Sequence, residues 1–266
     1  MGYQANGFVS EFPWVGDKIV VWDKDTKDII WEWSTFDYYS MNDYDTISDT
    51  WFQAATLGRF DWTHSNALDY DWSLDTNSIE KIYLSVRHLS RISKIDYNTK
   101  NIEWNIGLEM PSGDTTLGNE IKFSFQHSIH KSNLYPSCFA TLDNGNISEL
   151  LHENDFPFSR VIEVDVLEDN SCDIVWEYTL PEDLFGPFHG SAQKLNNGNY
   201  LINTAGMFNT GNHGGTIIEV TNSQEIVSIT TTETEWGGNV YSYRAYRIPS
   251  IHPNAFSLII DDLFIE

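Results

Sequence analysis

A strand–turn–strand pattern occurs four times along the chain and constrains the fold more than any other feature. Each copy has an apolar strand, an acidic or Asn-containing turn and a second strand, which carries Trp in three copies. The copies are IVVWDKDTKDIIWEW (19–33), ISKIDYNTKNIEWNIG (92–107), VIEVDVLEDNSCDIVWEY (161–178) and TIIEVTNSQEIVSIT (216–230). Alternating apolar and polar residues around turns rich in Asp, Asn, Thr and Lys are typical of β-hairpins.

The hairpins recur at a long, regular period, which predicts a repeat architecture. Trp31, Trp104 and Trp176 occupy matching places and are separated by 73 and 72 residues. Another pair of strands precedes three of the hairpins, so each repeat has about four strands. Four-stranded repeats are typical of the blades of a β-propeller. Because the period is long for a blade, we expect loop insertions, for example at 109–122 and 146–158.

We therefore predict an all-β fold, a single β-propeller domain over residues 1–266. It has about three full four-stranded blades and a half-blade at each end, and the final segment 240–251 could return an outer strand. A closed propeller usually has more blades, so the ring is expected to be partial or open, with N-terminal blades missing. The Trp residues of the hairpins are expected to pack blade against blade. No long helix is predicted, and 181–186 could form one short turn.

Composition narrows the functional classes. The chain of 266 residues has a formal net charge of −24, so it has little with which to neutralise the phosphates of a nucleic acid. No apolar run approaches the roughly 18 residues that a membrane-spanning helix needs, and the sequence has no recognisable signal peptide. Aromatic residues make up 14% of the chain, which favours strands and sheet packing.

The two cysteines, Cys138 and Cys172, leave the question of a disulfide open, because spacing alone does not establish pairing. No C-x-x-C motif is present, which excludes a zinc ribbon or a thioredoxin-type site. A D-x-D-x-D-G calcium loop is also absent. No metal is predicted. The LDNGN (142–146) and LNNGN (195–199) stretches are interpreted as turns only.

Three histidines fall at equivalent positions of successive repeats. His64 and His127 are expected on the first, innermost strand of their blades, and His189 near the same place in the third. Innermost strands line the central channel of a propeller, so these side chains should converge on one axis. Arg87 is expected on the strand beside His64. The remaining histidines are expected to be structural or exposed: His88, His130, His152, His213 and His252.

Strand alternation adds detail to this arrangement. His127 and His130 are three residues apart and should face opposite sides of a regular strand, as should the adjacent Arg87 and His88. Asn66 follows His64 by two residues and should share its face. Together these residues suit transfer of an anionic group, in which a neutral histidine attacks, an arginine binds the oxyanion and a second histidine moves a proton.

Five stretches carry a resemblance to a known family. The sequence is similar to the bacterial arylsulfate sulfotransferases, and D-W-x-H-x-N, S-x-R-H and Q-H in this order are specific as a set. The stretches are DWTHSNALDYD (61–71), IYLSVRHLSRISKIDYNTKNIEWNIG (82–107), FSFQHSIH (123–130), GSAQKLNNGNYLI (190–202) and YRAYRIPSI (243–251). The resemblance covers nearly the whole chain.

The resemblance implies a six-bladed propeller that moves a sulfuryl group from an aryl sulfate to a phenol without a cofactor. A phosphosulfate nucleotide donor is not implied. By position, His127 matches the nucleophile that forms a sulfohistidine in a ping-pong reaction. His64 matches a histidine that acts in acid–base catalysis or binds the oxyanion. Arg87 matches the arginine that binds the sulfate oxygens. Asn66 matches the asparagine beside that histidine, and His189 and Gln193 are assigned supporting, substrate-binding roles. The family also implies a periplasmic or secreted location, and its members can be dimeric.

One departure from the family qualifies the resemblance. The family has a further active-site histidine in an earlier blade, whereas no histidine precedes His64 here. The chain therefore resembles the C-terminal portion of such an enzyme. Two other readings stay open, a non-catalytic propeller that binds a partner and an aryl sulfate hydrolase that uses the same site. The sulfatase motif C/S-x-P-x-R is absent.

Overall fold

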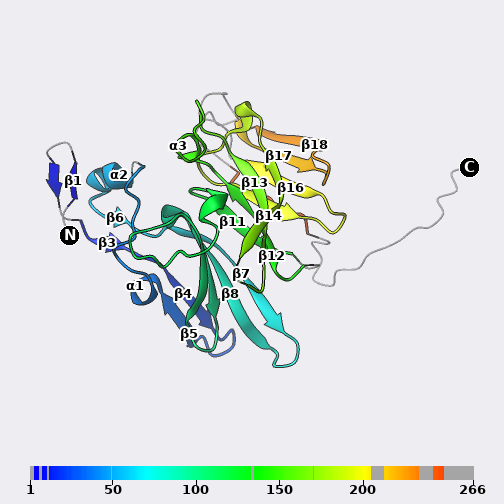
Figure 1. The fold of residues 1–266 in the computed structure, drawn as a ribbon. Coiled ribbons are helices and arrows are strands. Elements are labelled where there is room, and N and C mark those ends of the chain that lie inside the picture. Colours follow the sequence, from blue (N-terminus) through cyan, green and yellow to red (C-terminus); the bar gives the residue numbers. More distant parts are fainter. Residues whose placement is uncertain are drawn as a thin grey trace, which may run out of the picture.

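Three four-stranded antiparallel sheets form the centre of the molecule, which we describe from a computed structural model (Figure 1). It describes residues 3–5, 8–10, 12–48, 50–132, 135–169, 171–204, 213–233 and 242–248. In each sheet the strands are adjacent in chain order, as in a propeller blade. The first blade contains β7 (Ser65–Ser73), β8 (Ser78–Val86), β9 (Arg91–Asp96) and β10 (Ile102–Gly107).

The next two blades follow directly along the chain. The second blade contains β11 (His127–Lys131), β12 (Cys138–Asp143), β13 (Arg160–Val166) and β14 (Cys172–Thr179). The third blade contains β15 (Ser191–Lys194), β16 (Tyr200–Thr204), β17 (His213–Val220) and β18 (Ile226–Glu233). The first strands of neighbouring blades contact one another, β7 with β11 and β11 with β15. The predicted all-β propeller architecture is therefore confirmed.

The N-terminal half-blade is the hairpin of β4 (Lys18–Trp22) and β5 (Ile29–Ser34), which lies against the first blade (Figure 1). Two smaller pairs accompany it, β1 (Tyr3–Ala5) with β2 (Phe8–Ser10) and, in parallel, β3 (Trp14–Val15) with β6 (Phe60–Asp61). The helices are short: α1 (Thr35–Tyr38), α2 (Thr50–Leu57) and α3 (Ser148–His152). The short turn expected at 181–186 is a 3-10 turn at Glu182–Leu184.

Aromatic side chains pack between successive blades, as the repeated Trp positions predict. Trp31 of the half-blade stacks on Tyr97, and its indole N–H donates to the Tyr97 carbonyl. Trp176 of the second blade stacks on Tyr200 of the third at 3.6 Å between ring centroids, and its indole N–H donates to the Asn222 carbonyl. Each indole therefore buries its apolar body and still satisfies its polar group.

A buried ion pair fixes the first blade to the loop that follows the half-blade. Arg91 begins β9 and is fully buried, and its guanidinium donates to Asp43 at 2.5 Å. The Asp43 carboxylate also accepts the Ser112 backbone N–H at 2.8 Å and its hydroxyl at 2.6 Å. Because neither charge meets water, the pair depends on these bonds.

Segment 242–248 does not take the outer position expected for 240–251. It contains no strand and runs beside β15, the innermost strand of the third blade. The Gly190 N–H donates to the Tyr243 carbonyl at 3.0 Å, and the Gln193 side chain bonds both backbone groups of Arg247. These bonds to β15 hold the segment at the centre. Residues 240, 241 and 249–251 lie outside the described residues.

Two further expectations from composition concern cysteines and membrane helices. Cys138 and Cys172 are both free and buried, so the described structure contains no disulfide between them. Burial raises the pKa of each thiol to about 11. Among the described residues no helix is both long and apolar enough to cross a membrane.

Candidate active site

His127 is the first residue of β11 and is buried near the centre of the blades. Its ring centroid lies 6.1 Å from that of His189, which precedes β15, and 6.3 Å from that of Tyr243 in segment 242–248. His189 and Tyr243 are themselves 5.0 Å apart. The predicted convergence of His127 and His189 is therefore observed, and the C-terminal segment adds an aromatic ring that the sequence argument did not name.

A register shift interrupts β11 immediately after the buried histidine. Ser128 has φ +65°. His127 pairs with Leu142 and His130 pairs with Ala140, so β11 has one more residue than β12 between the two pairs. The Thr141 hydroxyl donates to the Ser128 carbonyl at 2.7 Å and so holds the irregular backbone. Because the strand is not regular, simple alternation does not establish that His127 and His130 face opposite sides.

Asn144, directly after β12, is the hydrogen-bond partner of His127. Its side-chain Oδ1 lies 2.8 Å from His127 Nδ1. Its Nδ2 donates to the carbonyls of Gly186 at 2.6 Å and His189 at 2.8 Å. The sequence predicts only a turn for the LDNGN stretch, and that prediction is incomplete, because Asn144 also bonds His127.

Arg87 lies in a 3-10 turn and not on a strand, since β8 ends at Val86. The turn is closed by Ser90 in the left-handed conformation, φ +46°. The buried guanidinium donates to the Pro187 carbonyl at 3.2 Å and lies over the Phe125 ring, 4.9 Å from its centroid. Aromatic faces stabilise such a cation without neutralising it. Strand alternation therefore does not describe Arg87 and His88.

His64 precedes β7 and has φ +49°, so it lies outside the strand on which it was expected. Its Nδ1 is 2.5 Å from Asp61 Oδ2, and its ring centroid is 4.6 Å from that of His88. Asn66 lies within β7 and donates to the Gln126 carbonyl of the second blade at 2.7 Å. The alternation that predicted a shared face for His64 and Asn66 therefore does not apply.

The sequence analysis does not name Asp61 as a partner of His64. His88, for which a structural or exposed place is expected, is buried beside His64, and its Nδ1 lies 2.5 Å from the Asp61 carbonyl oxygen. The spacing of Asp61 and His64 in D-W-x-H is the signal that could have revealed the carboxylate partner. Gln193, by contrast, contacts the backbone of Arg247 and holds segment 242–248.

Burial and the Arg87 charge determine the electrostatics of the site. Burial, and then the Arg87 cation, lower the pKa of His127 to about 3, and the Asn144 hydrogen bond opposes this only in part. The same two causes lower the pKa of His88 to about 4 and also lower that of His189. Burial opposes ionisation of Asp61, but His64, His88 and Arg87 together lower its pKa. Near neutral pH, His127 and His88 are uncharged and Asp61 is a carboxylate.

Asp61, His64 and His88 form one group, among the described residues, whose ligand atoms lie close enough to hold a metal ion, within 4.8 Å of one another. Asp61 and His64 already hydrogen-bond each other. The Arg87 charge acts on Asp61 and His88 and opposes a second cation there. We therefore assign no metal to the group.

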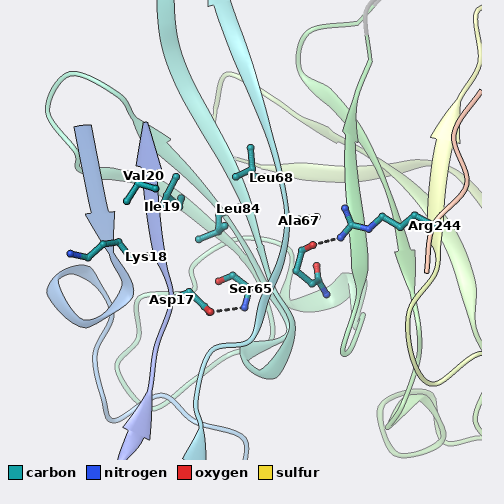
Figure 2. Close-up of a pocket in the computed structure, with 10 residues that line it drawn as sticks. Asp17, Lys18, Ile19, Val20, Ser65, Ala67, Leu68, Leu84 and Arg244 are labelled. Carbon is teal, nitrogen blue, oxygen red and sulfur yellow. Dashed lines mark hydrogen bonds between the residues drawn. The ribbon is translucent and has the colours of Figure 1, made fainter. Parts of the chain in front are cut away.

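A cavity of about 460 Å³ separates β4 from β7 (Figure 2), and the described residues that line it include Asn66 but no histidine. Ile19, Leu68 and Leu84 supply an apolar side, and Arg244 crosses from segment 242–248 to donate to the Asn66 carbonyl. Asp17 accepts the Ser65 N–H at 2.6 Å at the other end. The volume lies in the range of small-molecule sites.

The depressed histidine pKa values predict acid sensitivity. The unfolded imidazoles take up protons as the pH falls below about 6.5, whereas folded His127 and His88 resist until about 3 and 4. Their stabilising contribution is therefore complete above pH 6.5 and is lost as the pH falls toward 3–4. We expect each to remove about 1–2 kcal/mol of unfolding free energy between pH 6.5 and 5.

Urea unfolding of wild type and His127→Asn at several pH values between 7.5 and 5 measures this loss. The variant should show a flatter pH dependence, because the other titrating groups are common to both proteins. Parallel curves for the two proteins would mean that His127 titrates in the folded chain much as it does in the unfolded one.

Solved structures similar to this chain share little sequence identity with it. One solved structure, described as "Structure of Dos1 propeller", is 11% identical in sequence to this chain and has a TM-score of 0.44. The alignment covers 83% of this chain and 44% of that one. A protein of unknown function from Bacteroides caccae is 20% identical with a TM-score of 0.31, covering 55% of this chain and 38% of that one. The chain thus spans less than half the length of either. A search of curated proteins found no match.

The comparison with protein families gives a match over most of the chain. The family described as Arylsulfotransferase (ASST) matches residues 3–244, which include every histidine and arginine placed in the site above. The chain belongs to the arylsulfotransferase (ASST) family.

Proposed function

We propose that the chain transfers a sulfuryl group from an aryl sulfate to a phenol, and that His127 carries the group between them. Family membership supports sulfuryl transfer as the general activity. The observation that carries the proposal is an uncharged His127 whose pKa is lowered first by its burial and then by the nearby Arg87 cation. The first residue supplies a nucleophilic nitrogen, and the second supplies a fixed positive charge for sulfate oxygens.

In the first step, the Nε2 lone pair of His127 attacks sulfur, so that an N–S bond forms and the S–O bond to the aryl group breaks. Arg87 neutralises charge on the sulfuryl oxygens as the bonds exchange. The leaving aryl oxide takes the bonding electrons and receives a proton from His64. Asp61 supports this role, because its carboxylate stabilises positive charge on His64 before the proton leaves.

In the second step, a phenol enters and His64 removes its proton. The phenolic oxygen attacks sulfur, the N–S bond breaks, and His127 recovers its lone pair. The reaction uses neither a phosphosulfate nucleotide nor a metal. It is a ping-pong exchange in which donor and acceptor occupy the same site in turn.

The other residues singled out from the sequence take supporting roles in this proposal. His189 lies beside His127 and is assigned to substrate binding. Asn66 binds the carbonyl that precedes His127 and so supports that strand as well as the cavity wall. For Gln193 we propose an indirect role, which is to hold the segment that carries Tyr243. On the basis of the family alone, we also propose a periplasmic or secreted location.

Incubation with 4-nitrophenyl sulfate, with and without phenol, tests the activity. Sulfuryl transfer predicts nitrophenol release that requires phenol and yields phenyl sulfate. Release without phenol would instead indicate a hydrolase at the same site. Absence of release under either condition would favour a non-catalytic binding propeller.

Arg87→Lys should lower the turnover number by about 10²–10³-fold, because lysine keeps the charge but loses the planar fork. The exposed Arg59→Lys is the matched control and should retain full activity. Circular dichroism and the unfolding midpoint check that the lysine variant folds. A folded Arg87→Lys with normal turnover would remove the arginine from the sulfate-binding role.

A further inference from the structure

We propose that Asn144 is a positioning residue that fixes His127 in the neutral tautomer with its lone pair on Nε2. The inference rests on the proposed function, because it matters to catalysis only if His127 is the nucleophile. It concerns a side chain that follows β12 and contacts the reaction only through the imidazole it holds.

The orientation of the Asn144 amide follows from its other two contacts. Its nitrogen lies 2.6 Å from the Gly186 carbonyl oxygen and 2.8 Å from that of His189. Carbonyl oxygens only accept hydrogen bonds, so the amide NH2 group must face them. The amide oxygen is then the atom turned toward His127.

The orientation of the amide decides the tautomer of the imidazole. An amide oxygen is an acceptor only, so His127 Nδ1, 2.8 Å away, must carry the hydrogen. In a neutral ring the second nitrogen, Nε2, then has no hydrogen and holds the lone pair. The nucleophilic nitrogen is therefore selected by a contact on the opposite side of the ring.

The surroundings of His127 favour the neutral ring that this argument requires. The titratable groups that act on it are Arg87, His189 and His64, and each disfavours a positive charge there. The direct partner is an uncharged amide, which offers no countercharge. His64 has the opposite arrangement, since its Nδ1 bonds the carboxylate of Asp61. The amide of Asn144 therefore suits a neutral nucleophile at His127, and the carboxylate of Asp61 suits a proton donor at His64.

The same contact also acts on the covalent intermediate. When Nε2 bonds to sulfur, the ring keeps its Nδ1 hydrogen and gains positive charge. The Nδ1–H to Oδ1 bond then becomes charge-assisted and strengthens. Asn144 thus holds the ring in one orientation before and after the N–S bond forms.

The backbone around Asn144 is held firmly enough for such a role. The Asp143 carboxylate accepts the N–H groups of Ser124 at 2.9 Å and Gly145 at 3.0 Å. Gly145 has φ +67°, and a Cβ there would lie 1.8 Å from the Phe158 carbonyl oxygen. The Ser159 hydroxyl donates to the Asn144 carbonyl at 2.8 Å. Side chains and backbone together fix the turn.

Nitrogen-15 NMR of the histidine rings in the full chain tests the tautomer without requiring turnover, with His127→Asn used to assign the His127 signals. We expect a protonated Nδ1 and an unprotonated Nε2 between pH 5 and 8. Asn144→Ala should give mixed tautomers, and Asn144→Asp should give a ring that holds both protons at higher pH. A hydrogen on Nε2 in the wild type, or no change in either variant, would overturn the inference.

Kinetics of the first step connect the tautomer to catalysis. Asn144→Ala should slow sulfation of His127 by on the order of 10²-fold, and Asn144→Asp should shift its pH profile to higher pH. Asn105→Ala is the matched control, because Asn105 is also buried and donates to a backbone carbonyl. Should the control slow the step as much, the role of Asn144 would be merely structural. A correct tautomer in an inactive wild type would reject the proposed function while supporting the Asn144 contact.

Discussion

His127→Asn is expected to abolish acceptor-dependent release of nitrophenol from 4-nitrophenyl sulfate, lowering the rate by at least about 10³-fold. Removal of a nucleophile eliminates the covalent route, and the groups that remain supply only binding and charge stabilisation. The measurement is the initial rate with and without phenol at saturating donor. His130→Asn is the control, because His130 lies on the same strand and the charged group that acts on its pKa is Asp69 and not Arg87.

If His127 is the nucleophile, the two variants must differ in activity. Both should fold, which the near-ultraviolet circular dichroism of the many tryptophans reports. Full activity in His127→Asn would exclude this residue as the nucleophile. Equal losses in both variants would indicate that damage to β11 is responsible.

Asp43→Ala should destabilise the chain by about 3–5 kcal/mol, because it leaves the buried Arg91 guanidinium without its countercharge. It also removes the acceptor of the Ser112 backbone and hydroxyl bonds. Urea unfolding at pH 7 gives the free energy difference. Where the variant is too unstable to purify, Arg91→Met with Asp43→Ala should recover part of the loss, since the pair is then replaced together.

An exposed ion pair provides the comparison for this effect. Lys18 and Glu32 on the half-blade are 3.2 Å apart, and both are about half exposed. Solvent screens such a pair, so Glu32→Gln should change stability by no more than about 1 kcal/mol. If the two substitutions cost the same, burial of the Asp43–Arg91 pair would not be the source of its importance.

The blades could be predicted from the sequence because their periodicity is local and repeated. Trp31 and Trp176 recur at equivalent positions, since each blade needs an aromatic side chain to cover the next. The place of segment 242–248 could not be predicted in this way. Many of its bonds are made by side chains, such as that of Gln193, and it forms no strand, so no alternation marks it.

The places of the candidate site residues were predictable where the repeat determines them. The repeat placed His127 and His189 together. Arg87 lies in a turn after β8 and His64 precedes β7, where strand periodicity carries no information. Asn144 was missed because an Asn before Gly usually signals a turn. Here it forms the turn and also bonds the buried imidazole.

Mass mapping of the chain after brief exposure to 4-nitrophenyl sulfate without an acceptor shows whether His127 carries the sulfuryl group. We expect one sulfuryl group on the peptide that contains His127, formed with a single equivalent of nitrophenol. The group should disappear when phenol is added, with phenyl sulfate as the product. A sulfuryl group on another residue, or transfer to phenol with no modified protein at any time, would contradict this role of His127.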